Sequence, residues 1–166
     1  MSKTASVSFR ERNLWAYDVS LSILLAELIN VITDLNPGQH LRWLADLLPD
    51  LRRHAVVGAD FHLDLDLGLT DPQRDHLLTL IAAATERLRQ RETITAAEAA
   101  DWEVLDGHTV IWRSAPAVGT SPIAELGEAI TALVRGTLPD PPRGTWWLFG
   151  MTGGPGTIAM DIEGSG

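Results

Sequence analysis

The stretch "YDVSLSILLAELINVITDLNPG", from Tyr17 to Gly38, carries the strongest fold signal in the sequence. Its apolar residues recur at helical spacing: Leu21, Leu24, Leu25, Leu28, Ile32 and Leu35. Asp18 can cap the start, and the Asn-Pro-Gly run at 36–38 is a stop signal. The pattern predicts a helix from Asp18 to Leu35. Ser20, Glu27 and Asp34, spaced seven apart, predict a solvated stripe on its other side.

The sequence predicts four further helices after this one. A short one runs from about Gln39 to Leu48, and Pro49 should end or kink it because proline lacks the amide that a helix interior needs. Capping boxes at Thr70/Gln73 and Thr95/Glu98 start two more. The first of these extends from Asp71 to Arg91, and the second is short and starts at Ala96. A last helix runs from Pro122 to Arg135, with Ser121 as its cap.

Strand signals are fewer. "FHLDLDLGLT", Phe61 to Thr70, alternates apolar and polar residues as far as Leu67, which predicts a strand with Leu65 in the core. Between Trp102 and Trp112, Asp106-Gly107 is either a hairpin turn or the glycine stop of a longer helix, and we favour a short helix followed by a hairpin. "TWWLFG" and "TIAMDI" near the end predict a second hairpin.

These elements predict an α+β fold: an antiparallel sheet of three to five strands, with three to five helices packed mainly on one face. The length of 166 residues fits a single globular domain, 1–166. The polar residues 1–13 lack the apolar core of a signal peptide and are expected to be a mobile tail. The order of the strands cannot be read from this pattern.

Composition excludes several function classes. The net charge of −9 disfavours nucleic acid and anionic membranes and suits a basic protein partner. Absence of cysteine removes disulfides, thiol catalysis and cysteine-based metal sites. No apolar run is long enough for a transmembrane helix. Because the N-terminal residues lack the apolar core of a signal peptide, a cytoplasmic location is expected. One lysine against twelve arginines, with abundant Ala and Leu, indicates a GC-rich bacterial genome.

The alternating stretch poses one chemical question. With Asp60 in phase, it would place Asp60, His62, Asp64 and Asp66 on one strand face, as a metal or catalytic site or as a solvated surface. Two neighbouring carboxylates can share a cation, but all of them cannot reach one ion without a ligand from elsewhere, for which His108 is the obvious donor. We favour the solvated face and predict no metal and no cofactor.

Two other motifs are weak. The glycine-rich segment 150–157 lacks the spacing of a phosphate loop and precedes a strand, so it predicts a hairpin loop. "GTSPI" around Ser121 lacks the second glycine of a nucleophile elbow.

The adjacent Trp146 and Trp147 must face opposite sides of a strand. If Gly150 pairs with Thr157, Trp147 and Phe149 face the core, and Trp146 lies with Leu148 on a side that also carries Asp161. A large aromatic residue on such a face is typical of an interface anchor, and a covering helix or connector is the other interpretation.

The function that the sequence favours is therefore non-enzymatic: an acidic cytoplasmic protein that binds a basic protein partner or itself, in the manner of an inhibitor or immunity-type factor. Its binding residues would be Trp146, Leu148, Asp60, His62, Asp64 and Asp66. The alternative is a small enzyme or ligand-binding domain that uses the Asp60/His62/Asp64/Asp66 strand face with His108.

Overall fold

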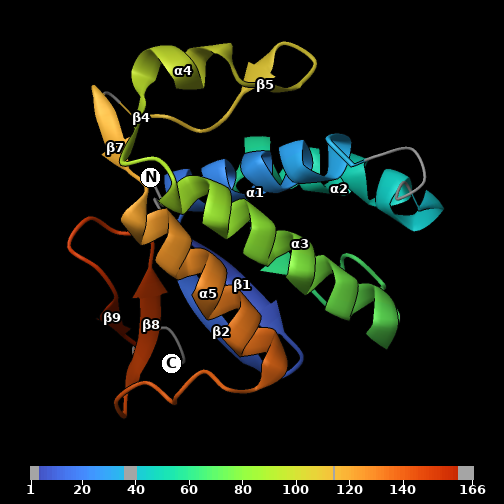
Figure 1. Cartoon of the computed structure of the whole chain (residues 1–166). Coiled ribbons are helices and arrows are strands. Elements are labelled where there is room, and N and C mark those ends of the chain that lie inside the picture. The colour runs from blue at the N-terminus through green and yellow to red at the C-terminus, as the bar shows by residue number, and fades with distance from the viewer. Residues whose placement is uncertain (1–3, 36–40, 114, 161–166) are drawn as a thin grey trace.

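A computed structural model describes residues 4–35, 41–113 and 115–160 of the chain (Figure 1). The helices of these residues are α1 (Asp18–Thr33), α2 (Arg42–Val57), α3 (Asp71–Arg89), α4 (Ala96–Asp101) and α5 (Ser121–Arg135). Their strands are β1 (Thr4–Phe9), β2 (Arg12–Tyr17), β3 (Phe61–His62), β4 (Thr93–Thr95), β5 (Glu103–Leu105), β6 (His108–Thr109), β7 (Ala117–Gly119), β8 (Thr145–Phe149) and β9 (Gly156–Ala159). The predicted α+β class is confirmed. None of the helices in this part of the chain is long and apolar enough to cross a membrane.

The main sheet is mixed, which corrects the expectation of a purely antiparallel sheet. Its strand order is β3-β1-β2-β8-β9. The pairs β1–β2 and β8–β9 are antiparallel, whereas β1–β3 and β2–β8 are parallel. The parallel pairs arise because helical segments carry the chain across the sheet between β1 and β3 and between β2 and β8, and such crossovers return a strand in the same direction.

The first two strands overturn the expectation of a mobile tail for residues 4–13. They form a hairpin in which Ala5, Val7 and Phe9 of β1 and Leu14 and Ala16 of β2 are all buried. The residues between them are only partly buried or exposed. One face of the hairpin therefore belongs to the core. In Figure 1, α5 lies across this face of β1 and β2, with α3 beside it.

Helix α1 is the centre of the molecule, packed against α2, α3 and α5. Fourteen of its sixteen residues are buried, including Ser20 and Glu27, so the predicted solvated stripe is wrong for these two residues. Each polar side chain binds a different segment. Ser20 Oγ donates to the Gly150 carbonyl at 2.6 Å. Glu27 forms an ion pair with Arg87, with 3.5 Å between Oε1 and Nη1.

Two more polar residues of α1 secure the start of the helix. Tyr17 occupies the N-cap position, and the carboxylate of Asp18 pairs with Arg113 through two hydrogen bonds instead of capping. These hydrogen bonds raise the pKa of Arg113, so its guanidinium stays charged. Ser22 Oγ donates to the Ala55 carbonyl and accepts from the Ile111 amide at 2.9 Å. A helix surrounded on all sides must satisfy its polar groups internally.

Helix α2 continues through Pro49 to Val57, which corrects the predicted end at Leu48. Leu44, Leu47 and Leu51 are buried on both sides of the proline, so packing against α1 sustains the helix where one backbone hydrogen bond is lost. The predicted start at Gln39 and the stop signal at 36–38 lie outside the described residues.

Both predicted capping boxes are confirmed. Thr70 and Gln73 exchange hydrogen bonds at the start of α3, as Thr95 and Glu98 do at the start of α4. The expected cap of α5 is wrong, because Thr120 occupies that position and the side chain of Ser121 makes no cap. The hairpin alternative for residues 102–112 is confirmed by the antiparallel pair β5–β6, joined through Asp106-Gly107. Strand β4 pairs with β7 in a third, separate sheet.

Candidate functional site

The aspartates of the alternating stretch bind backbone amides. Strand β3 ends at His62, and residues 63–67 form turns, so the predicted strand to Leu67 is wrong. Leu65 is 79% exposed, which also overturns its predicted place in the core. The amide of Ser6 donates to Asp60 Oδ1 at 2.9 Å, and the amide of Arg10 donates to Asp64 Oδ2 at 3.0 Å.

These two carboxylates extend a very short strand pair. Strand β3 pairs with β1 only at Val7↔Phe61 and Ser8↔His62, and the Leu63 amide adds a hydrogen bond to the Ser8 carbonyl at 2.9 Å. Asp60 and Asp64 then occupy the amides on either side of this pair. Asp66 Oδ2 accepts from the His62 amide at 2.8 Å, on the opposite edge of β3. The three aspartates thus close one edge of the sheet, which would otherwise present unpaired amides to other chains.

Two histidines adjoin this edge. Ser8 Oγ and His62 Nδ1 share a 2.6 Å hydrogen bond, whose donor depends on the tautomer of the imidazole. His54 is buried at the end of α2, with Nε2 3.5 Å from Asp66 Oδ2 and Nδ1 without a hydrogen-bond partner in the described residues. Burial lowers the pKa of His54, and the charge of Asp66 offsets part of this effect.

His108 does not lie in the sheet that contains β3 and the neighbouring aspartates. His108 is exposed in β6, which pairs only with β5 in a sheet of two strands. Within residues 4–35, 41–113 and 115–160, no cluster of three or more histidine, aspartate or glutamate side chains could hold a metal ion. Four pockets of about 170 to 340 Å³ open elsewhere on the described residues, and none of them is lined by Asp60, His62, Asp64 or Asp66.

The opposite face of the sheet, away from the buried side of β1 and β2, carries large apolar side chains. The register places Ser6 beside Trp15 and Trp15 beside Leu148. On the next rung, Trp146 lies beside Ile158. We call Trp15, Trp146, Leu148 and Ile158 the aromatic face. All four are half-buried, so each has a covered part and a part that meets solvent.

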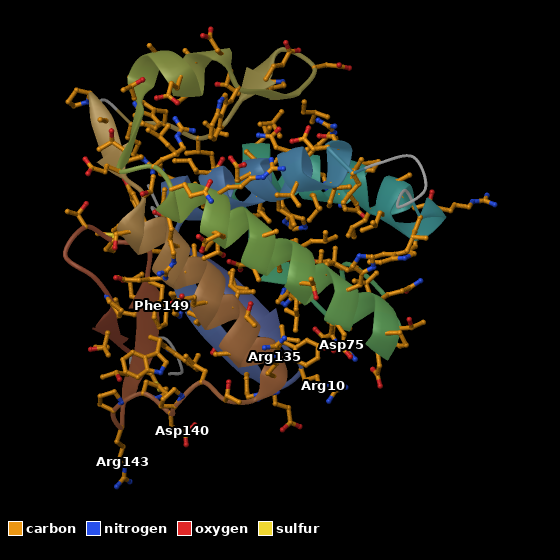
Figure 2. The ribbon with its side chains drawn as sticks, in the orientation of Figure 1. Arg10, Asp75, Arg135, Asp140, Arg143 and Phe149 are labelled. Carbon is orange, nitrogen blue, oxygen red and sulfur yellow. The ribbon has the colours of Figure 1, made fainter. Side chains whose placement is uncertain are left out.

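Trp146 and Trp147 of β8 face opposite sides of the sheet, as the sequence predicts. Phe149 is buried and Trp147 packs against the core, with its indole Nε1 donating to the Pro139 carbonyl at 2.7 Å. Trp146 and Leu148 alternate with them and face the other way. Figure 2 shows Phe149 beside α5, with Asp140 and Arg143 projecting from the connector at the far end of β8. A pocket of about 170 Å³ opens between this connector, residues 11–13 and the two tryptophans.

The predicted register of the last hairpin is wrong by three residues. Leu148 pairs with Gly156 and Trp146 with Ile158, and residues 150–155 form the loop between β8 and β9. The glycine-rich segment therefore belongs mainly to a hairpin loop. Asp161, expected opposite Trp146, lies outside the described residues. Because Ile158 takes that place, the observed face is more apolar than predicted.

Trp15 is a site residue that the sequence reasoning missed, because it placed no strand before residue 18. Its indole Nε1 is buried and has no hydrogen-bond acceptor in the described residues. The strict alternation of "RNLWAY", Arg12 to Tyr17, was the available signal.

The β3 edge, which carries Asp60 and Asp64, and the aromatic face belong to the same sheet. Asp60 binds the amide of Ser6, and Ser6 is the cross-strand partner of Trp15. The two groups are therefore separated by two strand spacings, about 10 Å. Asp60 and Asp64 form no ion pair with an arginine of the described residues, so backbone amides are the groups that bind their carboxylates.

Comparison of the chain with models of protein families, with curated proteins and with solved structures gives no match.

Proposed function

We propose that this protein is a non-enzymatic binding protein that docks a basic protein partner on its aromatic face, with Trp146 as the anchor. The observation that carries the proposal is the row of half-buried apolar side chains on the sheet face opposite the buried core residues. A buried aromatic side chain surrounded by smaller apolar contacts is the usual centre of a protein interface.

The charge distribution favours a basic partner. The whole chain carries a net charge of −9, and Asp60 and Asp64 stand at the edge of the sheet that holds the aromatic face. Charges at the rim of an interface mainly raise the rate of association and select among partners. Binding should therefore slow as salt concentration rises, while the contribution of Trp146 stays nearly constant because apolar burial is little screened. An inhibitor or immunity-type role belongs to this class of function.

Matched tryptophan variants test this proposal. Trp146→Ala and Trp15→Ala should lose the basic proteins that the immobilised wild-type chain retains from a cell extract, as quantified by mass spectrometry. Trp43→Ala, which removes an indole that packs against His76 away from the aromatic face, should retain them. Equal loss in all three variants would show that the retention does not depend on this face.

Protein stability separates anchoring from folding. Trp147→Ala should lower the melting temperature markedly, because it removes core packing and the hydrogen bond to Pro139. Trp146→Ala should change it little. If Trp146→Ala is the more destabilising of the two in the monomer, Trp146 is a folding residue and the proposal loses its anchor.

A second candidate function rests on the 2.6 Å contact between Ser8 and His62, which has the distance of a nucleophile and its base. The three aspartates are occupied by backbone amides, so in the described residues no carboxylate orients the His62 ring. Hydrolysis of p-nitrophenyl acetate at a rate that falls at least tenfold in both Ser8→Ala and His62→Ala would support this candidate. A rate unchanged by the two substitutions would eliminate it.

A further inference from the structure

The two edges of the main sheet are treated differently. At the β3 edge, side-chain oxygens of Asp60, Asp64 and Asp66 occupy the amides of Ser6, Arg10 and His62. Natural sheets close their edges in this way to prevent pairing with other chains. Strand β9 forms the other edge.

Hydrogen bonding fixes which groups of β9 point outward. The amide of Met160 donates to the Gly144 carbonyl at 2.9 Å, which extends the β8–β9 register by one pair. In an antiparallel ladder, hydrogen-bonded pairs alternate with non-bonded ones. The backbone groups of Ile158 and Gly156 therefore face β8. Those of Thr157 and Ala159 point away from the sheet.

Nothing in the described residues closes this second edge. Among the residues that the structure describes, the amides of Thr157 and Ala159 have no hydrogen-bond acceptor, and both residues are exposed. Strand β9 contains no proline and no charged residue, and the whole segment from Gly144 to Met160 is uncharged. Two of the usual barriers to strand addition, charged residues and proline within the edge strand, are thus missing from β9.

We propose that β9 accepts an extended basic segment of the partner as a sixth strand of the sheet. This inference rests on the proposed function and specifies how the partner is held. Backbone hydrogen bonds to Thr157 and Ala159 would set the register. Alternate side chains of the added strand would lie next to Ile158, and thus continue the aromatic face outward from Trp146.

A basic segment suits this edge better than a second copy of the chain does. Two copies would each bring a net charge of −9, and β9 offers the outward backbone groups of only two residues. Such a short strand pair buries far less than the roughly 1,200 Å² of a stable interface. A basic partner gains attraction from the same charge, and its body can add area on the aromatic face.

The test uses a synthetic octapeptide of alternating lysine and valine as the probe, titrated into the isotopically labelled chain and followed by NMR. The amides of Thr157 and Ala159 should shift and become protected from hydrogen exchange. The corresponding glutamate–valine peptide should bind at least tenfold more weakly. Absence of lysine–valine binding at millimolar peptide, or shifts that spare both amides, would overturn the inference.

Substitutions at one position then separate the edge from the face. Thr157→Pro removes an outward amide without touching the ladder to β8, and should weaken peptide binding at least tenfold. Thr157→Ala keeps the amide and should bind as the wild type does. If the two variants bind equally, the edge is not used. If only Trp146→Ala loses peptide binding, the proposed function stands and the strand addition at β9 does not. If only Thr157→Pro loses peptide binding, the strand addition stands and the role of Trp146 as anchor is contradicted.

Discussion

Neighbouring substitutions at Asp64 and Leu65 should have effects opposite to those expected from a regular strand. If the alternation of the sequence continued as a strand, Leu65→Ala would open a cavity in the core and cost about 2 to 5 kcal/mol. In the structure Leu65 is 79% exposed, so its truncation should change the free energy of unfolding by no more than about 0.5 kcal/mol.

Asp64→Ala should be the costly change. It removes a charge-assisted hydrogen bond of 3.0 Å to the amide of Arg10. Hydrogen bonds to charged groups contribute about 1.5 to 3 kcal/mol, and the exposure of Arg10 favours the lower end because water can replace the lost acceptor. Arg10 also holds a left-handed conformation, with φ of 57°, that this hydrogen bond helps to fix. We expect a loss of about 1 to 2 kcal/mol.

Urea unfolding at pH 7, followed by tryptophan fluorescence, measures both effects. Asp64→Asn is the matched control, because it keeps a side-chain oxygen acceptor and should lose less than Asp64→Ala does. A loss above 2 kcal/mol in Leu65→Ala, together with an unchanged Asp64→Ala, would refute the role assigned to the aspartates and restore the regular strand.

Burial lowers the pKa of His54, so the unfolded chain binds more protons just below the ordinary histidine pKa of 6.5, and the free energy of unfolding should fall as the pH drops through that value. His54→Gln should reduce this fall between pH 7.5 and 5.5, and an identical pH dependence in urea would contradict the assignment. Ser22→Ala should cost about 1 to 3 kcal/mol in the same assay, because it leaves the buried Ala55 carbonyl and the partly buried Ile111 amide without their partner. Gly127→Ala should destabilise despite better helix propensity, because its Cβ would collide with Thr85 Oγ1 between α3 and α5, and adding Thr85→Ala should restore stability.

Helices with local signals could be predicted from the sequence. The capping residues Thr70 and Thr95 form hydrogen bonds with residues only three positions away, so their effect does not depend on the rest of the fold. Helix α2 shows the limit of local reasoning. Pro49 breaks an isolated helix, but the burial of Leu44 and Leu51 against α1 outweighs that local cost.

Interpretation of the polar residues failed where tertiary contacts decide. Ser20 and Glu27 resemble a solvated stripe because their spacing matches one helix face, yet both are buried by segments packed against α1. Asp60 and Asp64 resemble alternate residues of a strand, yet they are spaced to reach the amides of β1. The groups that bind these four side chains are all far away in the sequence, so no local pattern contains this information.

The two faces of β8 could be predicted from the sequence. Trp146 and Leu148 were placed on the correct side of β8, because alternation is a local property of any strand. Their partner Ile158 was missed because the length of a glycine-rich loop does not define its register. Trp15 was missed because the serine and threonine residues of β1 made the first hairpin resemble a polar tail.

Fluorine NMR of the chain labelled with 5-fluorotryptophan tests the central claim most directly. The six tryptophans give six reporters, of which Trp15 and Trp146 lie on the aromatic face and Trp43 and Trp102 lie elsewhere. On titration with a basic partner retained by the wild-type chain, the resonances of Trp15 and Trp146 should move while those of Trp43 and Trp102 stay in place. Movement of Trp43 or Trp102 with Trp146 unchanged would show that the partner binds another surface and would contradict the proposed function.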